Sequence, residues 1–566
     1  MPPAEPLTEG FPTPERESVW TQLVNGIAEF GGLPVALLLF VPRCCISFLV
    51  IGVAMACRAV ARLVQTASGY QRKANLRILI ITDYMPPQTH GIAIRFRQYI
   101  DYMRKEGHEV HVFCTNIKRE TESSFDHPNL PSIVNPFNVK NMIAYSSGIK
   151  LAWYLGAKQW DIVHLVMPSN IPWAVLPVVA WRRIPIYVSH HVDMFYYVYA
   201  YVKLKLLADF GYTMYQFIMI LPTAWLAQVN AAPTLTFLNE HLQWINQRCA
   251  RKRIPSGVAH ERFLVENQEQ LVGERASLLA KCGLRGGGAK DDPCVILMVQ
   301  RLAPEKGTMR CLEALAEIPR VAGKPLSLDG QRPLHLLIAG DGPSRKTLES
   351  YGKQHDLPIT FAGNLPNTDL PPLYRAADIF VTCSTSETYG LTVLEALACG
   401  TPAVLPHCGV FDELWIGRIP NEWIYDEGTE VCVMLHAPHT PTHHAHAQFS
   451  LLTPLAPPLS VLAQGALLAA MQNAGQRKSK TTLAKHPIKA SWKDATHELL
   501  EQYEETIVAN LPKRQNLASI ISNLDSLLRA ALVTLAAYAL MRAYMGKMLK
   551  VAFKAIGVVD DLFGDD

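Results

Sequence analysis

The chain has 566 residues, which is enough for two domains of about 200 residues each with extensions at both ends. Its formal net charge is only +4, and no basic stripe with interleaved aromatic residues occurs, so we exclude nucleic acid as the main partner. The twelve cysteines include no CxxC pair, which argues against a zinc site or a disulfide framework and favours a reducing compartment.

The chain begins with a polar tail over residues 1–30, and an apolar segment follows over residues 31–66. Arg43 interrupts this segment, and both uncharged runs beside it are shorter than the roughly 20 residues that a membrane-spanning helix needs. A hairpin that enters or lies on the membrane fits better than a clean span, although a span that tolerates Arg43 stays open. Several glutamates precede the segment, which disfavours a signal peptide and therefore secretion.

An α/β domain is predicted next, and we place it at residues 75–255. A strand at 75–82, a helix at 94–105 and a strand at 109–114 form a βαβ unit. Gly91 lies in the first turn of this unit, where such folds bring their backbone close to a ligand.

The same domain contains a second strand end with polar residues. Short apolar strands are expected at 161–166 and 186–189, and the second runs into Ser189-His190-His191-Val192-Asp193. A histidine pair is more often structural, but a loop at a strand end between two such domains would border their cleft. The aromatic run at 194–201 either packs in a helix or meets a lipid headgroup.

Two strand-and-loop units open the second half. The strand at 295–299 leads into a loop with Arg301 and Lys306, and a guanidinium with an ammonium suits the two phosphates of a diphosphate. The strand at 334–339 ends in Gly340-Asp341-Gly342-Pro343, a sharp turn whose glycines permit close backbone approach to a ligand. Taken singly, each feature is more often structural than functional.

The third unit is the most informative part of the sequence. A strand at 377–383 leads to Glu387 at the carboxyl end of the sheet, where open α/β folds bind ligands. A glycine turn and a helix at 391–399 follow, and the amides at the start of that helix suit an anion. Glu395 lies eight residues after Glu387 and could reach a hydroxyl of the same ligand. The alternative is two unrelated surface glutamates.

Residues 427–490 are the least readable. The histidines His436, His439, His443, His444 and His446 suggest a metal site, but the Pro-rich, loop-like composition near 436–460 favours a solvated loop. We therefore expect no metal there. A helix is predicted again from Ser491, within residues 491–512.

The C-terminal tail at 516–566 has the pattern of a surface helix. An apolar run extends from Ala530 to Met541, and Lys547, Lys550 and Lys554 then share one helix face. This profile is typical of a helix that lies in an anionic membrane surface. The alternative is a pair of helices that pack on each other or on the N-terminal domain.

The runs RLAPEKG, GDGP and SETYGLTVLEALACG together resemble the donor-site signature of the family-four retaining glycosyltransferases. The resemblance implies the α/β GT-B fold, in which two Rossmann-like domains face a cleft. It places the acceptor domain at 75–255 and the nucleotide-sugar donor domain at 256–490, with 491–512 as a helix that crosses back. Hydrophobic helical extensions at both termini would complete the chain.

The resemblance also implies roles for individual residues. Arg301 and Lys306 would hold the diphosphate of the donor, Glu387 would bond sugar hydroxyls, and Glu395 would bond the ribose. The donor-binding set that we predict consists of Gly91, Arg301, Lys306, Gly340, Gly342, Thr388, Tyr389, Gly390, Leu391 and Glu395. Gln300 departs from the family, which usually has glycine before Arg-Leu.

Within that family, the runs THGIAIRFRQYIDYMRKEGHEV and VSHHVDMF resemble the sulfoquinovosyltransferases and their relatives. His191 fits the first histidine of their loop, whereas Asp193 replaces the second. Ala259 stands where their hinge has aspartate. These departures leave the particular sugar and acceptor open.

The resemblance therefore predicts a membrane-associated retaining glycosyltransferase. Its donor would be UDP-sulfoquinovose or another UDP-hexose and its acceptor a lipid such as diacylglycerol, on the cytosolic face or a plastid membrane. The alternatives are a hexosyl- or mannosyltransferase acting on phosphatidylinositol or a soluble acceptor, and a non-catalytic scaffold. His191 and Glu387 are the predicted catalytic residues, and Asp193 is a candidate base. We expect no cofactor besides the nucleotide sugar and no metal.

Overall fold

The structure is a computed structural model. The residues that it describes are 49–62, 73–85, 91–114, 132–135, 138–144, 155, 158–169, 172–195, 198, 205–242, 249–263, 268–284, 292–318, 326–327, 332–426, 491–511, 524–532, 534–535 and 539. The predicted polar tail at 1–30, the Pro/His-rich loop at 436–460 and the basic face of Lys547, Lys550 and Lys554 lie outside these residues. The chain divides into a larger unit, Gln65–Gln515, and a smaller unit made of Met1–Val64 and Asn516–Asp566.

The first half of the larger unit contains a parallel sheet of six strands in the order β2-β1-β5-β6-β7-β8. The strands are β1 (Arg77–Ile81), β2 (Glu109–Phe113), β5 (Ile162–Met167), β6 (Ile186–His190), β7 (Val229–Ala232) and β8 (Ala250–Arg253). Strands β5 and β6 are buried along their whole length, as expected for a parallel sheet with helices on both faces. A separate antiparallel hairpin consists of β3 (Ser132–Asn135) and β4 (Asn138–Ala144).

The helices of this half are α2 (Gly91–Lys105), α4 (Pro172–Trp181), α6 (Lys205–Tyr215), the π-helix η1 (Gln216–Ile220), α7 (Leu221–Leu226) and α8 (Leu235–His241). Helix α2 corrects one expectation, because it begins at Gly91 and not at residue 94. Ile92 and Ala93 are buried, so an earlier start places two more apolar side chains in the core. Gly91 is thus the first residue of the helix.

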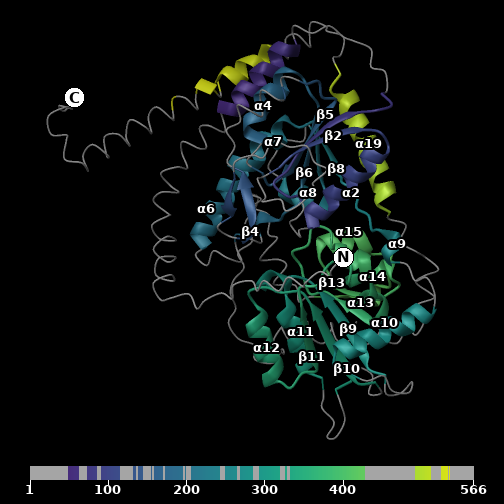
Figure 1. Cartoon of the computed structure of the whole chain (residues 1–566). Coiled ribbons are helices and arrows are strands. Elements are labelled where there is room, and N and C mark those ends of the chain that lie inside the picture. The colour runs from purple at the N-terminus through teal and green to yellow at the C-terminus, as the bar shows by residue number, and fades with distance from the viewer. Residues whose placement is uncertain are drawn as a thin grey trace, which may run out of the picture. The chain divides into compact units, whose positions relative to one another are not determined.

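The second half contains another parallel six-stranded sheet, in the order β11-β10-β9-β12-β13-β14. Its strands are β9 (Cys294–Val299), β10 (Leu334–Ala339), β11 (Ile359–Gly363), β12 (Ile379–Val381), β13 (Ala403–Pro406) and β14 (Ile424–Tyr425). Its helices are α9 (His260–Phe263), α10 (Gln268–Lys281), η2 (Pro304–Lys306), α11 (Thr308–Ala316), α12 (Arg345–Gln354), α13 (Leu370–Ala376), α14 (Leu391–Ala398), α15 (Gly409–Trp415) and η3 (Asn421–Trp423). Helices α11 and α12 lie on one side of this sheet, and α10, α13 and α14 lie on the other (Figure 1). The predicted α/β class with two Rossmann-like sheets is confirmed.

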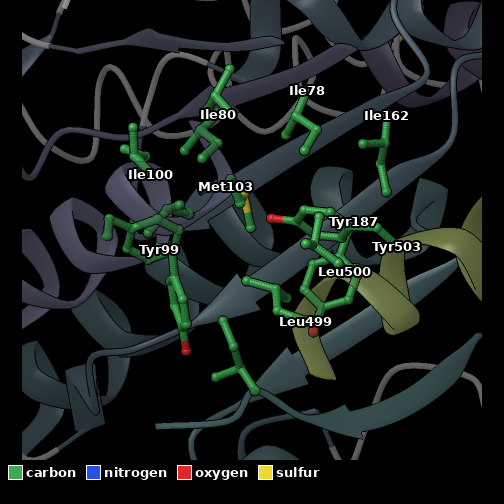
Figure 2. Close-up of a cluster of buried hydrophobic side chains, with 14 of the residues drawn as sticks. Ile78, Ile80, Tyr99, Ile100, Met103, Ile162, Tyr187, Leu499, Leu500 and Tyr503 are labelled. Carbon is green, nitrogen blue, oxygen red and sulfur yellow. The ribbon is translucent and has the colours of Figure 1, made fainter. Parts of the chain in front are cut away.

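A helix from far along the chain completes the core of the first half. Helix α19 (Trp492–Ala509) begins at Ser491, whose side chain accepts a hydrogen bond from Asp494 N, and it packs against α2. Its apolar face joins the cluster formed by β1, α2 and β5. Figure 2 shows the cluster, including Ile78, Ile80, Tyr99, Ile100, Met103, Ile162, Tyr187, Leu499, Leu500 and Tyr503.

The start of α19 also fixes the segment that joins the two halves. A Cβ atom at Gly257 would lie 2.5 Å from Trp492 N, so this close passage requires glycine. Val258 forms an isolated parallel β-bridge with Ser491. The crossover helix therefore touches both the first core and the connection to the second half.

The smaller unit contains helical residues at 49–62, and also at 524–532, 534–535 and 539. The two parts pack closely, because a Cβ atom at Gly52 would clash with Thr534 and would lie 3.1 Å from the Ala530 carbonyl oxygen. Four large apolar side chains of the C-terminal helical residues are exposed. Their spacing of three or four residues places them on one helix face. They are Leu524, Leu528, Leu532 and Leu535. Among the helices that the structure describes, none has the length and hydropathy needed to cross a membrane.

We predict that Leu499→Ala destabilises the larger unit by about 2–5 kcal/mol, because it leaves a cavity where the side chain is fully buried. Val508 lies on the same helix but is 52% exposed, so Val508→Ala should change the free energy of unfolding by no more than about 0.5 kcal/mol. Urea unfolding of both variants measures the difference. Equal losses would contradict the packing of α19 into this core.

Candidate functional site

Three loops meet at one edge of the second sheet. Strands β10, β9 and β12 are neighbours and run parallel, so the loops that follow them leave from the same edge. These loops carry Gly340, the pair Arg301 and Lys306, and Glu387, respectively. The structure therefore brings together residues that the sequence places in three separate segments.

Lys306 and Glu387 form an ion pair across two of these loops. Lys306 Nζ donates to Glu387 Oε1 at 2.5 Å and lies 3.5 Å from Ser384 Oγ. Burial raises the pKa of Glu387, but the Lys306 charge and the hydrogen bonds from Lys306 and Ser384 outweigh it and hold the pKa below its ordinary value. The pair is thus ionised at neutral pH. A phosphate that binds Lys306 must share it with this carboxylate or displace the carboxylate.

Arg301 has a similar but looser partner. Its Nη1 lies 3.7 Å from Glu305 Oε1, and its side chain is 39% exposed. Gln300 braces the same loop, because its Nε2 donates to Thr308 Oγ1 at 2.8 Å and to the Lys306 carbonyl at 3.2 Å. The side chain at the position where the resemblance expects glycine therefore ties the loop together.

The glycines after β10 have a packing reason. Gly340 has a φ of +141°, and a side chain there would clash with the Gln300 carbonyl. A side chain at Gly342 would clash with the Leu302 carbonyl. Both glycines thus allow the turn to pack on the Arg301 loop, and their contact with a donor stays a prediction.

The turn before α14 is held in a left-handed conformation. Gly390 has a φ of +78°, and a Cβ atom there would lie 2.6 Å from the ring of Phe411, so glycine is required. The next residue, Leu391, approaches the first half of the unit: a Cβ atom at Gly91 would lie 3.9 Å from Leu391 Cδ1. Gly91 and Leu391, both predicted to bind the donor, are therefore neighbours.

Glu395 lies one helix turn further along α14. Tyr374 donates its hydroxyl to Glu395 Oε2 at 2.9 Å. Burial raises the pKa of Glu395 to about 7, although the Tyr374 hydrogen bond and the Arg262 charge oppose this. The carboxyl group can therefore exist in both protonation states near neutral pH, and it can donate to or accept from a ligand hydroxyl.

The loop from Thr388 to Gly390 also contacts the end of β6. Thr388 Oγ1 donates to the His191 carbonyl at 3.3 Å. Tyr389 lies against Arg95 of α2, with 5.7 Å between the guanidinium carbon and the ring centroid. Asp193, the candidate base, accepts a hydrogen bond from Phe195 N at 3.1 Å. Glu387 thus lies one residue from a loop that both halves of the unit share.

Both ring nitrogens of His191 contact protein groups. Its Nδ1 lies 3.2 Å from Arg95 Nη1, and its Nε2 lies 2.8 Å from Ser189 Oγ. A guanidinium only donates, so Nδ1 accepts and the proton lies on Nε2, which donates to Ser189. A catalytic contact from the His191 ring to a substrate would therefore have to replace one of these bonds.

A chain of hydrogen bonds continues from Ser189 into the core. Ser189 Oγ lies 2.6 Å from His164 Nε2, and His164 Nδ1 lies 2.5 Å from the Tyr503 hydroxyl of α19. Burial lowers the pKa of His164 to about 3, so this ring is neutral. The crossover helix thereby supports the orientation of His191. Sequence analysis assigned no role to Arg95, although it lies in the run THGIAIRFRQYIDYMRKEGHEV, and it missed His164, which lies in none of the motifs.

Both halves of the larger unit resemble known glycosyltransferases. Residues 285–428 match the family of glycosyl transferases group 1, and residues 89–258 match glycosyltransferase family 4. An alpha-monoglucosyldiacylglycerol synthase of Streptococcus pneumoniae is 25% identical over 335 residues, which cover 58% of this chain and 70% of that protein. A sulfoquinovosyl transferase of Arabidopsis thaliana is 25% identical over 327 residues, which cover 56% of this chain and 57% of that protein.

A solved structure supports the architecture. Sucrose-phosphate synthase from Thermosynechococcus elongatus is 16% identical and superposes with a TM-score of 0.52, covering 77% of this chain and 100% of that one. Together with the two parallel sheets, this similarity confirms the predicted GT-B fold.

We predict that Glu395→Gln removes a pH dependence of stability. The pKa of Glu395 is raised from 4.5 to about 7 in the folded chain, so between these values the folded chain holds a proton that the unfolded chain has released. The contribution of Glu395 to stability is therefore complete below the lower value and is lost as pH rises through the upper one.

Thermal unfolding of wild type, Glu395→Gln and the exposed control Glu501→Gln, each at about pH 4.5 and about pH 8, tests this prediction. The drop in melting temperature between the two pH values should be smaller for Glu395→Gln than for wild type and the control. The same drop in all three proteins would contradict the raised pKa.

Proposed function

Because the chain belongs to the group 1 glycosyltransferases, we propose that it is a retaining enzyme that moves a sugar from a nucleotide-diphosphate sugar to a lipid acceptor at a membrane surface. The observation that carries this proposal is the 2.5 Å contact between Lys306 and Glu387. In a nucleotide sugar, one oxygen atom joins the sugar to its phosphate. A cation for the phosphate and a carboxylate for the sugar hydroxyls must therefore lie side by side.

Different residues of the second half bind different parts of the nucleotide-sugar donor. Arg301 and Lys306 hold the diphosphate, and they stabilise the negative charge that grows on it as the glycosidic bond breaks. Glu387 bonds hydroxyls of the transferred sugar. Glu395 bonds the ribose, and the backbone of the Thr388–Leu391 turn meets the sugar or the phosphates.

Because two protein cations already face the leaving diphosphate, we propose that transfer requires no metal ion. The acceptor hydroxyl attacks from the face that the diphosphate leaves, and the departing phosphate helps to take its proton. The His191 carbonyl accepts a hydrogen bond from Thr388, and Asp193 follows two residues later. We propose that both residues contribute to the acceptor side.

A lipid acceptor is supported by two independent observations. One of the two relatives is named for a glycolipid product, since it is an alpha-monoglucosyldiacylglycerol synthase. In addition, the smaller unit exposes the leucine face Leu524, Leu528, Leu532 and Leu535, and basic residues follow it in the sequence. We propose diacylglycerol as the acceptor, UDP-sulfoquinovose or another UDP-hexose as the donor, and the cytosolic face or a plastid membrane as the location.

An alternative concerns the sugar that is transferred and its acceptor. Asp193 replaces a histidine of the sulfoquinovosyltransferase-like loop, and this favours a hexosyl- or mannosyltransferase that acts on phosphatidylinositol or a soluble acceptor. A donor screen decides between the two. Nucleotide release would be measured for UDP- and GDP-sugars, with and without diacylglycerol vesicles, and with and without a chelator.

Release from a UDP-sugar that rises with diacylglycerol and is unaffected by the chelator supports the proposal. Release from GDP-mannose, or with a soluble acceptor alone, supports the alternative. Failure of every donor would leave a non-catalytic scaffold as the function.

We predict that Lys306→Ala and Arg301→Ala each lower kcat by about 100- to 1000-fold, because each removes a positive charge from the leaving diphosphate. Lys306→Ala should also raise the pKa of Glu387, since its ion-pair partner is lost. Lys346→Ala, at an exposed position of α12, is the matched control and should leave kcat unchanged. Near-normal turnover of either site variant would show that the diphosphate lies elsewhere.

We predict that the leucine face binds the membrane. The combined variant Leu524→Ser, Leu528→Ser and Leu532→Ser should lose most of its flotation with anionic vesicles, because each serine removes apolar surface from the bilayer contact. It should still bind nucleotide, since the donor residues lie in the other unit. Ile416→Ser alters an exposed apolar residue of the larger unit and serves as the control. Unchanged flotation of the triple variant would contradict this role.

A further inference from the structure

Arg95 is a buried cation that the predicted site does not use. It lies in α2, and its residue is only 4% exposed. Its neighbours are the neutral ring of His191, at 3.2 Å from Nη1, and the ring of Tyr389. Its Nε atom has no hydrogen-bond partner within the described part of the chain. In that same part, no carboxylate forms an ion pair with it.

An arrangement of this kind is costly in a folded protein. A buried ion normally has a counter-ion, because its lost hydration must be replaced. Burial lowers the pKa of Arg95, but a guanidinium stays protonated at any physiological pH. A hydrogen bond to a neutral ring and contact with an aromatic face replace only part of the lost hydration.

Lys306 and Arg301, the two cations proposed to bind the diphosphate, differ from Arg95 in this respect. Lys306 has the Glu387 carboxylate at 2.5 Å, and Arg301 has the Glu305 carboxylate at 3.7 Å. The second half of the unit therefore balances its own phosphate-binding cations, whereas the first half presents a cation that nothing in the described chain neutralises.

The position of Arg95 indicates which molecule supplies the missing charge. Tyr389, which it contacts, lies two residues after Glu387 in the loop proposed to bind the sugar. The same loop is bonded to the His191 carbonyl through Thr388. Arg95 thus faces the sugar-binding loop from the opposite half of the unit.

We propose that Arg95 is an oxyanion-binding residue of the substrate site, which pairs with a phosphate or sulfonate group carried by the nucleotide-sugar donor. This proposal rests on the proposed function, since it assigns a new contact to the same donor. His191 is then a positioning residue, because its Nδ1 accepts from Arg95 and its Nε2 is held by Ser189. A planar guanidinium in a fixed orientation can bind two oxygens of such a group at once.

Two variants separate the charge of Arg95 from its packing. Arg95→Gln keeps an amide that can donate to His191 Nδ1 but removes the charge, whereas Arg95→Lys keeps the charge but not the forked geometry. Arg97→Gln is the matched control, because Arg97 lies on the same helix with a side chain that is 60% exposed and close to Asp101. Circular dichroism and thermal unfolding establish that each variant is folded.

The measurements are the affinity for UDP by calorimetry and kcat/KM with UDP-glucose and UDP-sulfoquinovose. These donors differ in carrying a hydroxyl or a sulfonate at one sugar carbon. We expect Arg95→Gln to lower UDP affinity, kcat/KM or both by about 10- to 100-fold, as for loss of a hydrogen bond between charged groups. Arg95→Lys should lose less, and Arg97→Gln should stay within about twofold of wild type.

The pattern identifies the oxyanion. If UDP affinity falls together with kcat/KM for both donors, Arg95 binds the diphosphate. If only kcat/KM for UDP-sulfoquinovose falls, Arg95 binds the sulfonate. Either result supports the proposal. If folded Arg95→Gln and Arg95→Lys match wild type in all three measurements, the proposal is wrong.

Failure of the proposed function gives a different result. A wild-type protein that transfers sugar from no donor would refute the glycosyltransferase assignment of donor and acceptor. The UDP affinities of wild type and Arg95→Gln would still test the oxyanion contact, with a loss of affinity supporting it and equal affinities overturning it.

Discussion

Parallel pairing within each sheet places the carboxyl ends of the strands along one edge, and the candidate site depends on this constraint. Strand β9 lies between β10 and β12, so the loops with Arg301, Gly340 and Glu387 are neighbours at that edge. The first sheet does the same for His191, at the end of β6. Thr388 then joins the two edges through its bond to the His191 carbonyl.

Charge balance distinguishes the two sides of this junction. In the second half, Glu387 and Glu305 lie beside Lys306 and Arg301, so the diphosphate that we propose to bind there would compete with Glu387 for Lys306. On the opposite side, Arg95 is desolvated and lacks a described counter-ion. An anion would therefore displace a carboxylate from Lys306 on the donor side, whereas on the opposite side it would supply the counter-ion that Arg95 lacks among the described residues.

Stability and site geometry are linked through the crossover helix. Leu499 and Leu500 of α19 complete the first core, and Tyr503 of the same helix bonds His164. Through Ser189, that bond reaches the ring of His191. A buried network of this kind is rigid because each member would be left unsatisfied if one moved. Helix α19 thus contributes both to folding and to the orientation of His191, whose carbonyl bonds Thr388 of the second half.

The sequence by itself predicted most strands and turns correctly, and it supplied the residues of the candidate site. The apolar runs 295–299 and 334–339 predict buried strands, as β9 and β10 confirm, and the required glycine at 390 marks the turn before α14. These features are local, since they depend on side-chain period and on backbone conformations that few residues adopt. The start of α2 was misplaced by three residues, because burial of Ile92 and Ala93 depends on the core and not on the local pattern.

Only the tertiary structure decided which distant groups meet. Lys306 and Glu387 are 81 residues apart, and Arg95 and His191 are 96 apart, so no spacing in the sequence indicates either contact. The raised pKa of Glu395 likewise depends on burial beside Tyr374. The physical reason is that burial and charge pairing are properties of the assembled sheets. A sequence pattern specifies each strand, whereas the order of the strands decides which loop ends share an edge and which charges neutralise one another.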